Sequence, residues 1–149
     1  MLVIDDCKKF EGVIRGIAEL DARIFAANQW GFESLCDSAV NDYDLLLAEV
    51  SEVDDAVLGF GLLRCFDDAE VIRIAVDPEA RRQGIGRRIL DAMLEEAHSR
   101  DIENVFLEVR SSNEAAIGLY KGAGFAAEGI RKGYYSEPKE DAVIMRFTC

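Results

Sequence analysis

Two closely spaced glycines, Gly84 and Gly86, stand between a short apolar run and a long amphipathic segment, with arginines on both sides. A chain that enters a helix through such a turn presents several unpaired backbone N–H groups in one direction, where an anion can approach closely. Arg81 and Arg87 would add charge-assisted hydrogen bonds. The third glycine of a dinucleotide-binding fingerprint and the Lys-Ser/Thr pair of a Walker loop are both missing. The pattern indicates a phosphate-binding turn; an ordinary strand-to-helix turn with solvated arginines is the alternative.

Downstream of this turn, one carboxylate and one phenol have side chains that can move protons. Glu108 is a lone carboxylate in an apolar run, so partial burial would raise its pKa and suit it to act as a general base. Tyr120 follows in a predicted helix, and its phenol is a candidate general acid. Spacing alone leaves two structural roles open: Glu108 in a surface ion pair with Arg110, and Tyr120 in the core with its hydroxyl bound to the backbone.

Regular elements are predicted around each of these residues. Apolar positions recur at three- and four-residue steps from Ile85 to Ala97, which predicts a helix that begins at the glycine turn. The run over residues 104–109 predicts a strand that carries Glu108. Asn113 is a suitable N-cap for a helix over residues 113–121, which Gly122 and Gly124 would end. Because a helix joins the strand before the turn to the strand of Glu108, these two strands should be parallel.

The rest of the chain predicts a mixed sheet with helices on both faces. Helices are expected over residues 10–25 and 32–40, and strands over residues 2–4, 45–50, 56–63, 70–76, 125–130 and 142–147. Short polar turns connect three consecutive strands and so predict an antiparallel meander. The fold class is therefore α/β, or α+β, and the length of 149 residues predicts one domain over residues 1–149.

The overall charge limits the partners. Seventeen basic and 29 acidic residues give a formal net charge of -12, which argues against a nucleic-acid or anionic-membrane surface and favours a basic partner. No apolar run approaches the length of a membrane span, and the acidic N-terminus does not resemble a signal peptide. Cys7, Cys36, Cys65 and Cys149 show neither metal-ligand spacing nor a disulfide framework. We therefore expect reduced thiols and a cytoplasmic protein.

These motifs together resemble those of a known family. The segment Arg81-Arg82-Gln83-Gly84-Ile85-Gly86, which follows Ile74-Ala75-Val76-Asp77-Pro78, resembles the acetyl-CoA pyrophosphate loop, Gln/Arg-x-x-Gly-x-Gly/Ala, of the GNAT superfamily of N-acetyltransferases. Further matching residues are Leu107-Glu108-Val109-Arg110, Ser112-Asn113, Ala116, Leu119-Tyr120, Gly124-Phe125 and Arg131-Lys132-Gly133-Tyr134-Tyr135. From about Glu70 to Phe147 the chain is similar to the ribosomal-protein-alanine N-acetyltransferases of the RimI type; upstream of Leu45 the resemblance is thin.

The resemblance implies a fold, a cosubstrate and site residues. The GNAT fold has a central sheet of about six to seven strands, splayed between the strands that contain Ile74 and Leu107. Acetyl-CoA would be the cosubstrate, with no metal. Its pantetheine arm would lie along the backbone of Ile74, Ala75 and Val76, and its pyrophosphate at Arg81, Arg82, Gln83, Gly84, Ile85, Gly86 and Arg87, with Asn113 as a further contact. Glu108 matches the proton acceptor and Tyr120 the proton donor to the leaving sulfur.

The implied activity is acetyl transfer to the N-terminal α-amine of a protein or peptide, such as a ribosomal protein. Two alternatives stay open: an enzyme that acetylates a small amine or a lysine side chain, and a non-catalytic acetyl-CoA sensor. The chain departs from its relatives on the acceptor side. Gln29 and Gly31 flank Trp30 where relatives often have Pro-Trp-Ser, and Lys121-Gly122-Ala123 replaces a charged-bulky-Leu run.

Overall fold

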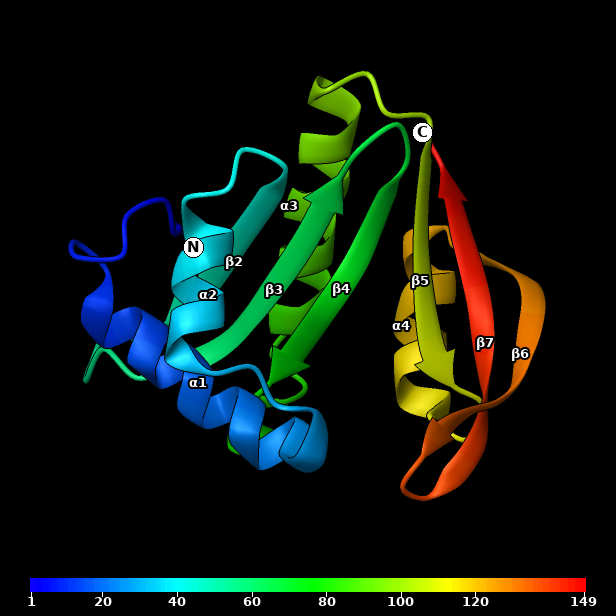
Figure 1. Ribbon diagram of the computed structural model, residues 1–149, viewed down its shortest axis with the longest axis horizontal. Helices are drawn as coiled ribbons and strands as arrows, with labels where there is room; N and C mark the ends of the chain where they lie inside the picture. Colours follow the sequence, from blue (N-terminus) through cyan, green and yellow to red (C-terminus); the bar gives the residue numbers. More distant parts are fainter.

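The computed structural model describes all residues from 1 to 149 and contains one seven-stranded sheet with helices on both faces (Figure 1). The elements follow the chain in the order β1 (Leu2–Val3), α1 (Glu11–Phe25), η1 (Ala26–Asn28), α2 (Phe32–Ala39), β2 (Asp44–Val50), β3 (Val57–Cys65), β4 (Ala69–Val76), η2 (Pro78–Ala80), α3 (Ile85–Ser99), β5 (Asn104–Arg110), α4 (Glu114–Ala123), β6 (Ala126–Ser136) and β7 (Lys139–Thr148). The strand order in the sheet is β1-β2-β3-β4-β5-β7-β6. None of the helices combines the length and apolar character needed to span a bilayer.

Each face of the sheet has its own hydrophobic core. Helices α1 and α2 cover one face over β2 to β4, while α3 and α4 cover the opposite face (Figure 1). The periodicity explains this packing, because α1 buries Ile14, Ile17 and Leu20, which share one side of the helix. Helix α3 likewise buries Ile85, Ile89, Leu90, Met93, Leu94 and Ala97. The predicted mixed sheet with helices on both faces is confirmed.

Strands β4 and β5 are neighbours over only two residue pairs, Ala69 with Val105 and Glu70 with Phe106. Their pairing is parallel, as the strand-helix-strand succession predicted, whereas all the other strand pairs are antiparallel. Beyond Glu70 the two strands diverge, so the sheet opens between them (Figure 1). The backbone edge of β4 from Val71 to Val76 therefore has a strand partner on the β3 side alone.

A bulge in β4 changes which face its side chains meet. Leu63 pairs with Val71 and Leu62 pairs with Arg73, so Ile72 is an extra residue without an opposite number. Before the bulge, Val71 packs in the core beneath α3. After it, Ala75 packs in the core beneath α1, and Ile74 packs toward α3. The bulge thus orients the three residues predicted to line the cosubstrate.

The last two strands form a longer hairpin than predicted. Strand β6 continues to Ser136 rather than ending at Ile130, and β7 begins at Lys139 rather than at Ala142. The added residues are mostly polar, so they carry no apolar alternation that would mark them as strand. Helix α4 also continues through Gly122, and Gly124 ends it in the left-handed conformation at φ 109°.

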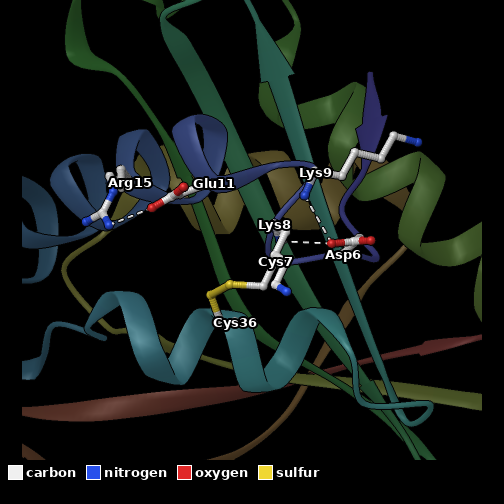
Figure 2. Close-up of a disulfide and its surroundings, with 7 residues drawn as sticks. All are labelled: Asp6, Cys7, Lys8, Lys9, Glu11, Arg15 and Cys36. Atoms are coloured by element: carbon white, nitrogen blue, oxygen red, sulfur yellow. Dashed lines mark hydrogen bonds and ion pairs between the residues drawn. A yellow bond between two sulfur atoms is a disulfide. The ribbon is translucent and has the colours of Figure 1, made fainter.

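The expectation that all cysteines are reduced is wrong for one pair. Cys7 and Cys36 form a disulfide, with Cα atoms 5.2 Å apart, that connects the segment before α1 to α2 (Figure 2). They are 29 positions apart in the sequence, and only the folding of α2 beside α1 brings them together. Cys65 is a free buried thiol and Cys149 a free exposed thiol, as predicted.

Candidate active site

The glycine turn has the geometry of an anion site. Arg82 and Gly84 both have left-handed backbone conformations, at φ 66° and 75°. Gly84 is the N-cap of α3, and no side chain caps this end of the helix. The regular hydrogen bonds of α3 begin with the N–H of Arg88, which donates to the carbonyl of Gly84. The N–H groups of the first turn, from Ile85 to Arg87, are therefore left for a ligand.

The arginines around the turn divide into two kinds. Arg88 is engaged within the protein, because it donates to the Gln83 carbonyl at 2.8 Å and pairs with Glu49 at 2.5 Å. Arg87 pairs with Asp91 at 2.9 Å and donates to the Gly122 carbonyl at 3.2 Å, which ties α3 to α4. Arg81 and Arg82 are exposed and form no ion pair. Of the three arginines predicted to meet the cosubstrate, these two are the free cations.

Gly86 and Asn113 have local structural roles that the sequence only partly indicated. A Cβ at Gly86 would lie 3.3 Å from Leu119 and 3.5 Å from Val76, so the small residue permits close packing of α3 on α4 and β4. Asn113 caps α4 as predicted, because its side-chain oxygen accepts a hydrogen bond from the N–H of Ala116 at 3.1 Å. Its side-chain NH₂ group remains available as a donor.

Glu108 lies on the open face of β5. Its neighbours Leu107 and Val109 are buried in the core beneath the helices α3 and α4, so the alternation of the strand directs Glu108 the other way. There it borders a cavity of about 540 Å³ at the junction of β4 and β5. The lining includes Arg64, Glu70, Phe106, Glu108, Arg131 and Ile144. The side chain of Glu108 is only 18% exposed.

The ion-pair partner of Glu108 is Arg131 on β6, not Arg110. The Nε of Arg131 lies 3.1 Å from Oε1 of Glu108. The hydroxyl of Tyr134 also interacts with Glu108, and this interaction is the main reason why the pKa of Tyr134 is raised. Arg110 instead pairs with Glu140 at 3.4 Å and donates to the carbonyl of Pro138 at 2.9 Å. It therefore anchors the β6–β7 turn.

Sequence reasoning missed Glu70 as a neighbour of Glu108. Glu70 is at the rim of the same cavity, on the other side of the opening between β4 and β5. Partial burial raises the pKa of Glu70, and the negative charge of Glu108 raises it further. The predicted parallel pairing of β4 with β5 could have indicated that Glu70 and Glu108 are neighbours. The register of that pairing, which decides how close they lie, could not be predicted from the sequence.

Tyr120 lies on the opposite side of β5. It is 7% exposed and packs in the core that holds Leu107 and Val109, with its ring centroid 5.9 Å from that of Phe125. Burial raises its pKa to about 12, with a smaller contribution from Tyr135, and no hydrogen bond contributes to this shift. The alternative role for Tyr120, a core tyrosine whose hydroxyl is bound to the backbone, is therefore not what the structure shows.

A buried ion pair holds the loop between α1 and α2 against the open face. Asp21 is fully buried, lies 3.2 Å from Arg73 of β4 and accepts a hydrogen bond from the N–H of Trp30 at 2.5 Å. Arg73 also donates to the Asn28 carbonyl and lies over the ring of Phe25. The bulge in β4 turns Arg73 toward α1, and nothing in the sequence pattern indicated this contact.

Comparisons with known proteins agree with this architecture. The sequence model of the Acetyltransferase (GNAT) family matches residues 14–125. The [ribosomal protein bS18]-alanine N-acetyltransferase of Escherichia coli strain K12 is 46% identical over 81 residues, which are 53% of this chain and 55% of that protein. A putative [ribosomal protein bS18]-alanine N-acetyltransferase of Bacillus subtilis strain 168 is 41% identical over 100 residues, 66% of each chain.

The crystal structure of the ribosomal-protein-S18-alanine N-acetyltransferase from Escherichia coli superposes with a TM-score of 0.78 at 30% identity, over 91% of this chain and 86% of that one. The alignment with the curated E. coli protein, in contrast, spans little more than half of that protein's length. The predicted GNAT fold, with its sheet opened between β4 and β5, is confirmed. On the family match and the shared fold, the chain belongs to the GNAT family of acetyltransferases.

Proposed function

We propose that this protein transfers an acetyl group from acetyl-CoA to the N-terminal α-amine of a protein or peptide, by direct attack of the amine. The observation that carries the proposal is the placement of Glu108 and Tyr120 on opposite faces of β5, beside the opening of the sheet. A base and an acid on opposite sides of the reacting carbon solve the two proton problems of acetyl transfer, at the attacking amine and at the departing thiolate.

The residues of the chain fit acetyl-CoA. The free edge of β4 at Ile74, Ala75 and Val76 leaves backbone groups that a pantetheine amide can pair with, as a neighbouring strand would. The uncapped N-terminus of α3 offers its N–H groups to a pyrophosphate, and Arg81 and Arg82 add positive charge. We assign Gln83, Gly84, Ile85 and Gly86 to the same turn, with Arg87 at its border, and Asn113, the N-cap of α4, as a further contact of acetyl-CoA. When bound, acetyl-CoA supplies the thioester.

Glu108 acts on the amine side of the reaction. An acceptor reaches the enzyme mainly as an ammonium ion, which must lose a proton before its nitrogen can attack. The Glu108 carboxylate faces the cavity, from which an acceptor can deliver that proton; in the protein without acceptor it pairs with Arg131 and lies beside Tyr134. Buried neighbours on either side of Glu108 along β5 hold the strand in place.

Tyr120 acts on the sulfur side. Its raised pKa of about 12 keeps the phenol protonated at neutral pH, so that a proton is available when the thiolate departs. No hydrogen bond within the protein contributes to the pKa of Tyr120, so its hydroxyl is free to donate to the departing sulfur. Neither free cysteine belongs to this region of the site, and no acyl-cysteine step is required.

The acceptor class is proposed from the open face and from the relatives. Aromatic side chains lie on the two segments that flank the opening of the sheet. One segment is the loop held by Asp21 and Arg73, which carries Trp30; the other is β6, which carries Tyr134 and Tyr135. The names of the E. coli and B. subtilis relatives specify a ribosomal protein alanine as their substrate. The net charge of -12 favours a basic acceptor, and a ribosomal protein is one such candidate. Because ribosomal proteins are cytoplasmic, such an acceptor implies that this domain of residues 1–149 acts in the cytoplasm.

Mass spectrometry with a panel of acceptors tests the proposal. Purified protein and acetyl-CoA are incubated with peptides that differ only in their first residue, with a polyamine and with an Nα-blocked lysine peptide. We expect acetylated product and free CoA thiol with some of the free-N-terminus peptides. Acetylation of the polyamine or the blocked peptide alone would move the assignment to a small-amine or lysine acetyltransferase. Acetyl-CoA binding without any acetylated product would identify a sensor.

A further inference from the structure

Arg131 reaches Glu108 across an intervening strand. In the sheet, Arg131 on β6 pairs with Ala142 on β7, while Glu108 on β5 pairs with Ile144 on β7. The guanidinium must therefore cross β7 diagonally, which the small side chain of Ala142 permits. It forms one ion pair, of 3.1 Å, and lies over the ring of Tyr134, 5.5 Å from the ring centroid; the Arg131 side chain remains 57% exposed.

The positive charge of Arg131 serves two carboxylates at once. Glu70 and Glu108 line the same cavity from opposite sides of the sheet opening. The negative charge of Glu108 raises the pKa of Glu70, and the positive charges of Arg64 and Arg131 lower it. Two carboxylates at one cavity repel each other unless a cation lies near them. In the protein without acceptor, two arginines of the cavity supply this charge: Arg64, which is held by two hydrogen bonds to Asp44, and Arg131, which pairs with Glu108.

The backbone beside Arg131 pairs irregularly with β7, and the N–H of Gly133 donates a hydrogen bond to the Asp141 side chain at 2.8 Å. The register of β6 and β7 shifts between the pair of Arg131 with Ala142 and the pair of Tyr135 with Glu140. The residues between, Lys132 to Tyr134, include Gly133 at φ 62° and have no paired partner in the strand register. A side chain that is largely exposed and held by one ion pair and one exposed cation–π contact costs little to displace.

We propose that Arg131 is a specificity-determining residue: it occupies the place of the acceptor's ammonium beside Glu108 and Glu70 and is displaced when the acceptor binds. This inference rests on the proposed function and names the event that precedes proton transfer. An acceptor with an ammonium group replaces the charge of Arg131, so Glu108 keeps a cationic partner. A molecule without that charge, such as the acetylated product, leaves Arg131 in place.

Substitution of Arg131 separates this role from a structural one. Arg131→Met keeps most of the length of the side chain and removes the competing charge, whereas Arg131→Lys keeps the charge. Arg146→Met is a matched control, because Arg146 forms a comparable ion pair of 3.2 Å with Glu128 on the same hairpin and is 44% exposed. The measurements are KM and kcat for a free-N-terminus peptide at saturating acetyl-CoA. Calorimetry gives the Kd of the CoA-bound enzyme for that peptide and for its Nα-acetylated form.

In Arg131→Met we expect the KM and Kd of the free peptide to fall about two- to fivefold, which is the effect of removing one exposed competing ion pair. The Kd of the acetylated peptide should not change, and Arg131→Lys and Arg146→Met should match the wild type. An unchanged or weaker Kd for the free peptide in Arg131→Met would overturn the inference, as would an equal shift for both peptides. If the wild type acetylates no peptide at all, the proposed function fails instead.

Discussion

Removing the hydroxyl of Tyr120 should change how the stability of the protein depends on alkaline pH. Tyr120 is 7% exposed, and burial raises its pKa from 10.0 to about 12. The folded protein therefore holds the phenol proton more tightly than the unfolded chain does. In Tyr120→Phe this group no longer titrates, so its contribution to the pH dependence disappears.

The sign and size follow from linkage. The folded pKa is the higher of the two, so the stabilisation from the phenol proton is fully present below the unfolded pKa, near 10. It is lost as the pH rises toward the folded pKa, near 12. Two pKa units correspond to about 2.7 kcal/mol in total, and about half of this, roughly 1.4 kcal/mol, is lost by pH 11.

Urea unfolding at pH 8 and pH 11 measures this loss. Between the two pH values, the wild type should lose about 1.4 kcal/mol more free energy of unfolding than Tyr120→Phe, because the other titrating groups are common to both proteins. As a control, Tyr43→Phe removes the hydroxyl of a tyrosine that is 56% exposed. Between the two pH values it should lose as much free energy of unfolding as the wild type. Equal losses in the wild type and Tyr120→Phe would refute the assignment of Tyr120 as a buried, protonated phenol. At neutral pH the same variant should retain acetyl-CoA affinity and lose kcat by about 10²- to 10⁴-fold.

Three further substitutions test the other parts of the site and the fold. Glu108→Gln should lower kcat by about 10²- to 10⁴-fold with little change in the calorimetric Kd for acetyl-CoA, and full activity would exclude Glu108 as the base. Gly84→Asp should abolish acetyl-CoA binding, because the φ of Gly84 is 75° and the new carboxylate would face the pyrophosphate. Gly12→Asp is the control: a Cβ at Gly12 meets open space, so this variant should bind acetyl-CoA normally. Cys7→Ser should lower the free energy of unfolding by about 3–4 kcal/mol, and thiol labelling of the denatured wild type should count two free thiols before reduction and four after it.

Most of the fold could be predicted because its elements have clear periodicity. The apolar positions of α1 and α3 recur at helical spacing, and Asn113 caps α4 as its residue type suggested. The full length of β6 and β7 could not be predicted, because residues such as Arg131 and Lys139 are polar. They belong to the strands only because β6 and β7 pair with each other. The Cys7–Cys36 disulfide depends on a helix pair that forms in three dimensions.

The site shows the same division between local and non-local information. The glycine turn, the strand of Glu108 and the helix of Tyr120 follow from residues that are close in sequence. The partner of Glu108 does not, because Arg110 and Arg131 are both candidates by charge, and only the β5-β7-β6 order decides between them. Arg73 likewise meets Asp21 only because a bulge in β4 turns it toward α1.

One experiment tests the proposed activity most directly. A peptide with a free N-terminus and one internal lysine is incubated with acetyl-CoA and the wild type or Glu108→Gln, and fragmentation mass spectrometry locates the acetyl group. We expect acetyl on the α-amine alone in the wild type, and product formed at least about a hundredfold more slowly in the variant. Acetyl on the lysine in preference to the α-amine, or equal rates in the two proteins, would contradict the proposed activity.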